Sequence, residues 1–97
     1  MSDFTVRVEL HGATGKDYED LHAAMQKAGF YRAFVATDGH TYALPTAEYA
    51  HTSNQDQFEV RDRAKGIAMS LKHWATEPWA LVTKCDGQRA VSSKRLK

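Results

Sequence analysis

Residues 4–49 read FTVRVELHGATGKDYEDLHAAMQKAGFYRAFVATDGHTYALPTAEY, and the periodicities within this stretch decide the fold. Its first seven residues alternate between apolar and polar side chains, and the apolar set is Phe4, Val6, Val8 and Leu10. Because successive side chains of a β-strand point to opposite faces, this alternation predicts a strand with one buried and one wet face. The chain therefore begins with a strand of a sheet that is covered on one side.

A helix with a defined start and end is expected next. Thr14 is a suitable N-cap with Asp17 at the third helical position, a weaker relative of the capping box that uses Glu or Gln there. Apolar residues then recur at three- and four-residue steps, at Tyr18, Leu21, Met25 and Ala28. Gly29 is suited to the left-handed position that ends a helix, and Phe30 is placed to fold back on the last turn.

A β-hairpin is predicted after this helix. Residues 32–37 are rich in strand formers, and Asp38-Gly39 is a favoured pair for a tight type I′ turn before a second strand over residues 40–44. Pro45 cannot donate a ladder hydrogen bond. We therefore expect the strand to break or bulge at Pro45, to resume over residues 48–51, and to lie near a sheet edge.

The second half of the chain predicts one more helix and one more strand. Ser53 is a candidate N-cap with Asp56 three residues later, and we expect Gly66 to allow close helix packing. The buried stripe of this helix is predicted to be Val60, Ala64, Ile67, Ala68 and Leu71. Residues 79–85 are apolar on both faces at Leu81 and Val82, as is typical of a central strand. A short extra strand over residues 88–92 is a further prediction.

The order βαββαβ predicts a ferredoxin-like α+β fold. Each helix has one apolar stripe, and right-handed crossovers place both helices on one face of a single antiparallel sheet. The expected strand order is 4-1-3-2, with the first and last strands central and the hairpin strands outside. We expect one domain over residues 1–92 and a basic tail over residues 93–97.

Composition and charge exclude several classes of protein. Lys and Arg (13) nearly balance Asp and Glu (12) over 97 residues, so the net charge of +1 gives no bulk attraction to nucleic acid or to an anionic membrane. The apolar stretches are too short to span a bilayer, and the N-terminus lacks the pattern of a secretory signal. The single Cys85 cannot form an internal disulfide, so the expected location is the cytoplasm.

The first half of the chain resembles a known family. The matching pieces are the opening strand, the Asp17-Tyr18 helix start, Gly29-Phe30, Asp38-Gly39 and Leu44-Pro45-Thr46-Ala47-Glu48-Tyr49. They are similar to the GhoS family of endoribonuclease antitoxins, which belongs to type V toxin–antitoxin systems of bacteria and their prophages. The second half is similar only in outline. The resemblance implies a ferredoxin-like fold related to CRISPR-associated nucleases, and an antitoxin that cleaves the messenger RNA of a membrane-damaging toxin.

One departure from the related nucleases shapes the choice of site residues. Those nucleases carry an acidic metal-binding residue at the end of the first strand, where this chain has Leu10-His11-Gly12. A cleavage that needs no metal or cofactor is therefore favoured, with a base, an acid and a cation as its requirements. His11 is the candidate base and Arg32 the candidate catalytic cation. Arg7, Tyr31 and Tyr49 are candidate contacts for single-stranded RNA.

A function of another class remains open beside this one. His11 also fits an ordinary surface histidine, since the sequence shows no partner for it, and Arg7 fits a cross-strand pair. The alternative is a non-catalytic protein-binding module, encoded by a mobile element, that inhibits or bridges a partner through its open sheet face or an edge strand. The near-neutral charge favours this alternative. The residues leave open whether the chain is an enzyme and whether it forms a homodimer.

Overall fold

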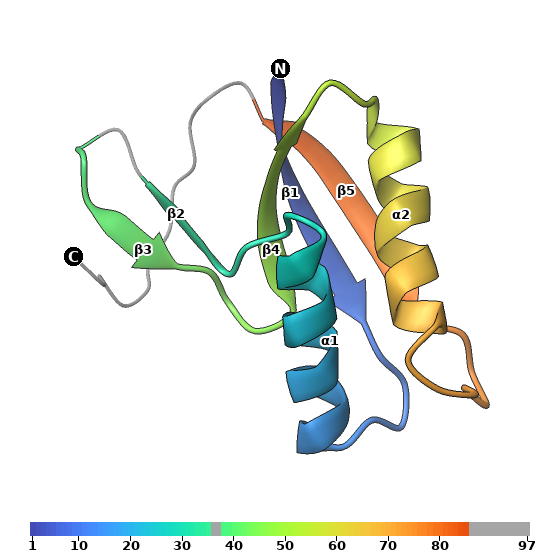
Figure 1. Ribbon diagram of the computed structural model, residues 1–97. Helices are drawn as coiled ribbons and strands as arrows, with labels where there is room; N and C mark the ends of the chain where they lie inside the picture. The colour runs from blue at the N-terminus through green and yellow to red at the C-terminus, as the bar shows by residue number, and fades with distance from the viewer. Residues whose placement is uncertain (36–37, 86–97) are drawn as a thin grey trace.

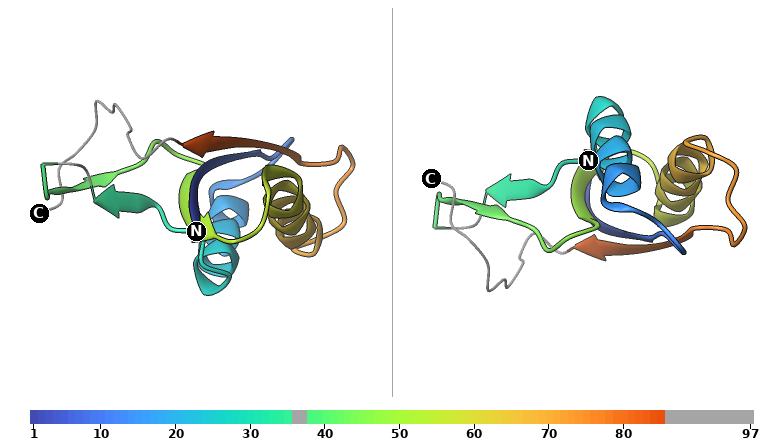
Figure 2. Two further views of the ribbon diagram at one scale, coloured as in Figure 1. Left: turned by 90° about the horizontal axis from the view of Figure 1, so that it is seen from above. Right: turned by 90° about the horizontal axis from the view of Figure 1, so that it is seen from below.

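The computed structural model describes residues 1–35 and 38–85, and this part of the chain forms a two-layer α+β fold (Figure 1). Its elements are β1 (Ser2–Glu9), α1 (Gly15–Lys27), β2 (Ala33–Val35), β3 (Thr41–Ala43), β4 (Glu48–Ser53), α2 (Gln57–Met69) and β5 (Trp79–Cys85). The main sheet is antiparallel with the order β4-β1-β5, and both helices cover one of its faces (Figure 2). The ferredoxin-like α+β fold predicted from the sequence is confirmed.

β1 is the central strand of this sheet and the centre of the core. It pairs with β4 from Ser2 to Arg7 and with β5 from Asp3 to Glu9, so nearly its whole length is bonded on both edges. The four apolar residues of the predicted alternation, Phe4, Val6, Val8 and Leu10, are all buried under the helices. The alternation therefore assigned the two faces of β1 correctly.

The predicted ends of α1 are both confirmed. The Thr14 hydroxyl accepts a hydrogen bond from the Asp17 N–H, and the Asp17 carboxylate accepts one from the Thr14 N–H at 2.9 Å, which closes the capping box. At the other end Gly29 has a φ of +88°, and the Phe30 N–H donates to the Met25 carbonyl. This backbone arrangement turns the chain back and buries Phe30 completely.

The hairpin departs from the predicted single sheet. β2 and β3 form a separate two-stranded sheet that projects away from the helices (Figure 2), joined to β4 by one isolated bridge between Tyr31 and Ala50. The predicted break at Pro45 is confirmed, and Ala47, with a φ of 67°, reorients the chain before β4. Because the strand is interrupted there, only its second part pairs with β1. The predicted type I′ turn involves Thr37, which lies outside the described residues.

Two details of α2 differ from the prediction. Its N-cap is Asp56 and not Ser53, because the Asp56 carboxylate accepts from the Phe58 and Glu59 N–H groups while the Glu59 side chain accepts from the Asp56 N–H. Gly66 does not serve close packing, since a Cβ atom placed on it would meet no atom within 4 Å. The buried stripe is confirmed: Val60, Ala64 and Ala68 are buried, while Ile67 and Leu71 are partly buried.

β5 has the predicted bounds but not the predicted central position. Within the described residues it pairs only with β1, at the edge that the order 4-1-3-2 itself requires. Leu81 lies opposite Arg7 on the uncovered face and is 63% exposed, which explains why an apolar residue here did not indicate burial. The predicted strand over residues 88–92 and the tail over residues 93–97 lie outside the described part of the chain. Neither of the two described helices is long and apolar enough to cross a membrane.

The assignment of the α2 cap can be tested by substitution. Asp56→Ala should lower the free energy of unfolding by roughly 1 kcal/mol, because two N–H groups of the first helical turn lose their acceptor. Asp56→Asn keeps an acceptor oxygen and serves as the matched control. Chemical denaturation of both variants and of Ser53→Ala gives the comparison. A larger loss for Ser53→Ala than for Asp56→Ala would contradict this assignment.

Candidate functional site

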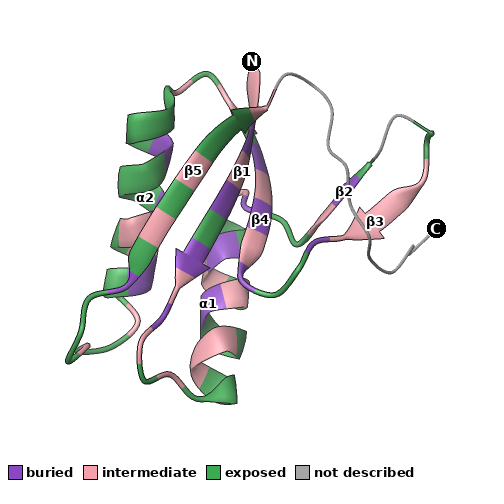
Figure 3. Cartoon of the chain, turned by 180° about the vertical axis from the view of Figure 1, so that it is seen from behind, coloured by how far each residue is buried: buried purple, intermediate pink, exposed green. Residues whose placement is uncertain are grey.

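The uncovered face of the sheet carries a cluster of polar and aromatic side chains at the C-terminal end of β1. Residues paired across an antiparallel ladder share a face, so Arg7 and Glu9 stand beside Leu81 and Trp79 of β5. Trp79 and Leu81 are each 63% exposed, and these four residues together with Ala80 line a hollow of about 200 Å³. The same face is turned toward the viewer in Figure 3, where exposed and half-buried residues alternate along β5.

His11 is held beside this hollow from three directions. Its Nδ1 lies 2.9 Å from the carbonyl oxygen of Glu77, and its Nε2 lies 3.4 Å from the carboxylate of Glu9. The His11 ring also contacts the Trp79 ring in an edge-to-face arrangement, with 4.6 Å between the two ring centroids. We call Arg7, Glu9, His11, Trp79 and Leu81 the open-face cluster. The predicted candidate base therefore has a carboxylate partner that the sequence did not reveal.

The hydrogen-bond geometry of His11 indicates its protonation pattern. A carbonyl oxygen only accepts hydrogen bonds, so His11 Nδ1 carries a proton and donates a hydrogen bond to the backbone carbonyl of Glu77. Nε2 faces a carboxylate, which also only accepts when ionised. A doubly protonated imidazole satisfies both oxygens, whereas a neutral ring turns a lone pair toward Glu9. When Nε2 carries a proton, His11 is suited to donate that proton and Glu9 to accept one, which reverses the role of base expected for His11 from the sequence.

Two other predicted residues, Arg32 and Tyr31, lie elsewhere. Both are exposed on the segment between α1 and β2, where they line a separate pocket of about 380 Å³ with Gln26, Ala33 and Ala43. Within the described ranges, Arg32 and His11 share neither an interaction nor a pocket. The fold therefore does not assemble the predicted pair of His11 and Arg32 into one site.

Tyr49 is not available as a base-stacking residue. It is completely buried, and its hydroxyl lies 2.6 Å from His22 Nδ1, which ties α1 to β4. Burial raises the pKa of Tyr49 well above its usual range, and burial followed by the nearby Arg32 lowers the pKa of His22. The tyrosine hydroxyl is therefore the donor to a neutral His22. Sequence spacing carried no signal for this pair, because the two residues are far apart in the chain.

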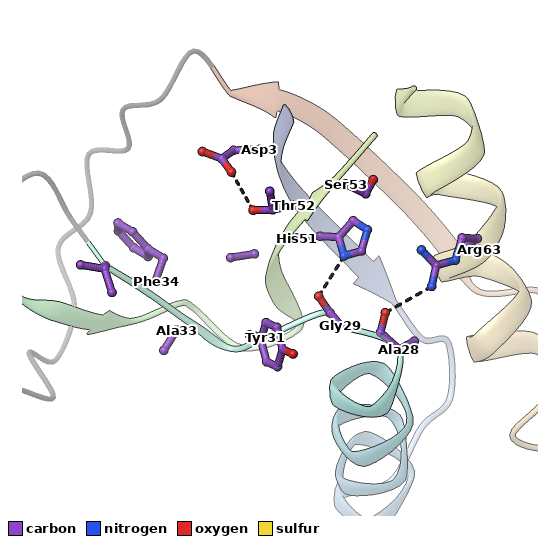
Figure 4. A pocket seen from close by; sticks show the side chains of 12 residues that line it. Asp3, Ala28, Gly29, Tyr31, Ala33, Phe34, His51, Thr52, Ser53 and Arg63 are labelled. Carbon is purple, nitrogen blue, oxygen red and sulfur yellow. Dashed lines mark hydrogen bonds between the residues drawn. The ribbon is translucent and has the colours of Figure 1, made fainter. Parts of the chain in front are cut away.

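A third cavity, of about 550 Å³, lies where the outer edge of β4 meets the end of α1 and the hairpin (Figure 4). Its lining includes His51, which is only 5% exposed and was not singled out in the sequence. His51 Nδ1 donates to the Gly29 carbonyl at 2.8 Å, and the ring stacks on Phe30 at 4.1 Å. Among residues 1–35 and 38–85, none supplies a hydrogen-bond partner to the buried His51 Nε2. An unsatisfied buried acceptor of this kind destabilises a fold by about 1–3 kcal/mol.

The described residues contain no group of three or more His, Cys, Asp or Glu side chains arranged to hold a metal ion.

Comparisons with protein-family models, with curated proteins and with solved structures gave no match.

The lowered pKa of His22 predicts a pH dependence of stability. The ordinary pKa of histidine is 6.5, and below this pH His22 is protonated in the unfolded chain while it stays neutral in the folded chain. The unfolded state therefore binds more protons. The free energy of unfolding of the wild-type protein, relative to His22→Gln, should therefore fall as the pH drops from 6.5 through the lower pKa of the folded state. Urea unfolding of both proteins between neutral and mildly acidic pH measures this difference. Parallel pH profiles would show that His22 has an unperturbed pKa.

Proposed function

We propose that the protein is a metal-independent endoribonuclease that cleaves single-stranded RNA at the open-face cluster, as an antitoxin acting on a toxin transcript in the cytoplasm. The observation that carries the proposal is the contact of His11 with both Glu9 and Trp79, two residues that line one hollow together with Arg7. An acid, a base, a cation and an exposed aromatic surface are thereby gathered on one sheet face. The resemblance of residues 4–49 to the GhoS family supplies the biological setting.

The cluster supports cleavage by the ribose 2′-hydroxyl. Glu9 takes the proton of this hydroxyl, and the resulting oxygen attacks the adjacent phosphorus. The bond from phosphorus to the 5′-oxygen breaks, and His11 delivers its Nε2 proton to that leaving oxygen. The products are a 2′,3′-cyclic phosphate and a free 5′-hydroxyl. Arg7 is positioned to stabilise the negative charge that develops on the phosphate oxygens.

Binding in this proposal relies on stacking more than on charge. Trp79 is exposed and is held by its contact with His11, and stacking of a base on an aromatic ring contributes roughly 1–3 kcal/mol. Glu9 and Glu48 flank Arg7 on the same face, so the local field is not strongly positive. We therefore expect RNA binding to weaken only modestly as salt increases. Arg32 and Tyr31 lie outside the cluster and have no step in the cleavage.

The proposal is tested by incubating the purified protein with single-stranded RNA, with and without a chelator. Cleavage should be equal in both, and His11→Ala and Glu9→Gln should each lower the rate by about 10²–10⁴-fold, since each removes a proton-transfer group. His73→Ala, at an exposed histidine that is not part of the cluster, is the control and should cleave normally.

The distribution of activity among the variants decides the assignment. Normal cleavage by His11→Ala would contradict the assignment of the active site to this cluster. Loss of cleavage in the presence of chelator would contradict the metal-independent mechanism. Retained folding of each variant is checked by its unfolding curve.

A second function is favoured by the apolar part of the same face. Trp79 and Leu81 are both largely exposed on an edge strand, as in a surface that docks a protein partner. Under this alternative, Leu81→Lys should abolish a complex with the partner, and no RNA should be cut under any condition. Leu81→Lys with unchanged complex formation would contradict a role for this face in binding.

A further inference from the structure

The cavity beside His51 is far from the open-face cluster. Its residue on β1 is Asp3, whereas the cluster begins at Arg7 on the same strand. Four residues of extended strand separate the two by about 13 Å. Any ligand of this cavity is therefore bound independently of the chemistry proposed for His11. The volume of about 550 Å³ is in the usual range for small-molecule sites.

The buried acceptor on His51 sets the first requirement for a ligand. Because Nδ1 donates to the Gly29 carbonyl, Nε2 of the neutral ring carries a lone pair. In Figure 4 this second nitrogen points away from Gly29, toward the side of the cavity on which Arg63 is drawn. Stacking on Phe30 prevents the ring from turning to find another partner. The group that completes this site must therefore supply an N–H or O–H donor.

Arg63 sets the second requirement. Its guanidinium lies 5.5 Å from the Phe30 ring centroid, so the ring on which His51 stacks also contacts the cation. One Nη donates to the Ala28 carbonyl and the other to the Gln55 side chain, which fixes the guanidinium at the cavity wall. A guanidinium has five N–H donors, so further donors remain for an anion. No carboxylate is recorded in an ion pair with Arg63 among the described residues.

The opposite wall is aromatic and apolar. Tyr31, which is 52% exposed, and Phe34 line it together with small side chains of the hairpin and of β4. The exposed ring of Tyr31 offers a face for a planar group. Asp3 also lines the cavity, and its carboxylate already accepts from the Thr52 hydroxyl, so it can accept a further donor from a ligand.

We propose that this cavity binds a small aromatic anion of the nucleoside monophosphate class. The phosphate pairs with Arg63, a ribose hydroxyl donates to His51 Nε2, and the base lies against Tyr31 and Phe34. This ligand satisfies the buried acceptor, uses the free donors of the guanidinium and covers the exposed aromatic ring at once.

The probe for the test is AMP, titrated into the full-length protein and followed by calorimetry and by the ¹⁵N resonance of His51 Nε2. Saturation should shift that resonance in the direction of a hydrogen-bonded nitrogen. Arg63→Gln should weaken AMP binding by at least about 10-fold, since a charged hydrogen bond is lost. Arg61→Gln is the matched control, because Arg61 is on the same helix and pairs with Asp62 instead of lining the cavity. It should bind AMP as the wild-type protein does.

Three results would overturn the proposal. The first is no binding of AMP to the wild-type protein, and the second is an Nε2 resonance that stays unchanged at saturation, as expected if a bound water already occupies this acceptor. The third is inorganic phosphate or adenosine binding as tightly as AMP, because the anion site and the aromatic wall would then not act together. His51→Phe keeps a ring to stack on Phe30 and should weaken AMP binding if it folds. Because the Nε2 measurement uses the wild-type protein, it decides the matter even if this variant unfolds.

Discussion

The alternation of side chains along β1 is the constraint on which the rest of the structure depends. With hydrogen bonds on both edges, the strand cannot slip by one residue without moving Phe4, Val6 and Val8 from the core to water. The same register fixes Arg7 and Glu9 on the opposite face, directly beside the residues of β5. Burial of one face therefore positions the candidate site residues of the other, although neither Arg7 nor Glu9 contributes to the core.

The parts that could be predicted are those governed by local sequence. The Thr14 cap, the left-handed Gly29 and the break at Pro45 each depend on a few neighbouring residues, and the chain adopts all three. Ser53 and Asp56 are both good caps, and local sequence could not decide between them because the choice depends on where β4 ends. The exposure of Leu81 depends on which face of the sheet the two helices cover, and no periodicity within β5 encodes this choice.

The candidate site could be predicted only in part, because several of its contacts join residues that are distant in the sequence. The position of His11 at the end of β1 follows from the alternation, but its contacts are with Glu77 in the loop before β5 and with Trp79 at the start of β5, more than sixty residues away. Tyr49 lies in the part of the sequence that carries the family resemblance, and yet it is a buried partner of His22. His11 and His51 each have Nδ1 hydrogen-bonded to a carbonyl oxygen, and His22 has Nδ1 hydrogen-bonded to a hydroxyl. The surroundings of the three rings differ, and these surroundings depend on residues distant in the sequence.

The attachment of the hairpin has a consequence for the evolution of this chain. Because β2 and β3 complete their own ladder and meet β4 in a single bridge, changes in hairpin length or tip sequence leave the β4-β1-β5 register intact. The packing of the core therefore places little demand on the hairpin. We expect substitutions in this arm to be tolerated more readily than substitutions in the strands and helices, so that its surface can change without a new fold.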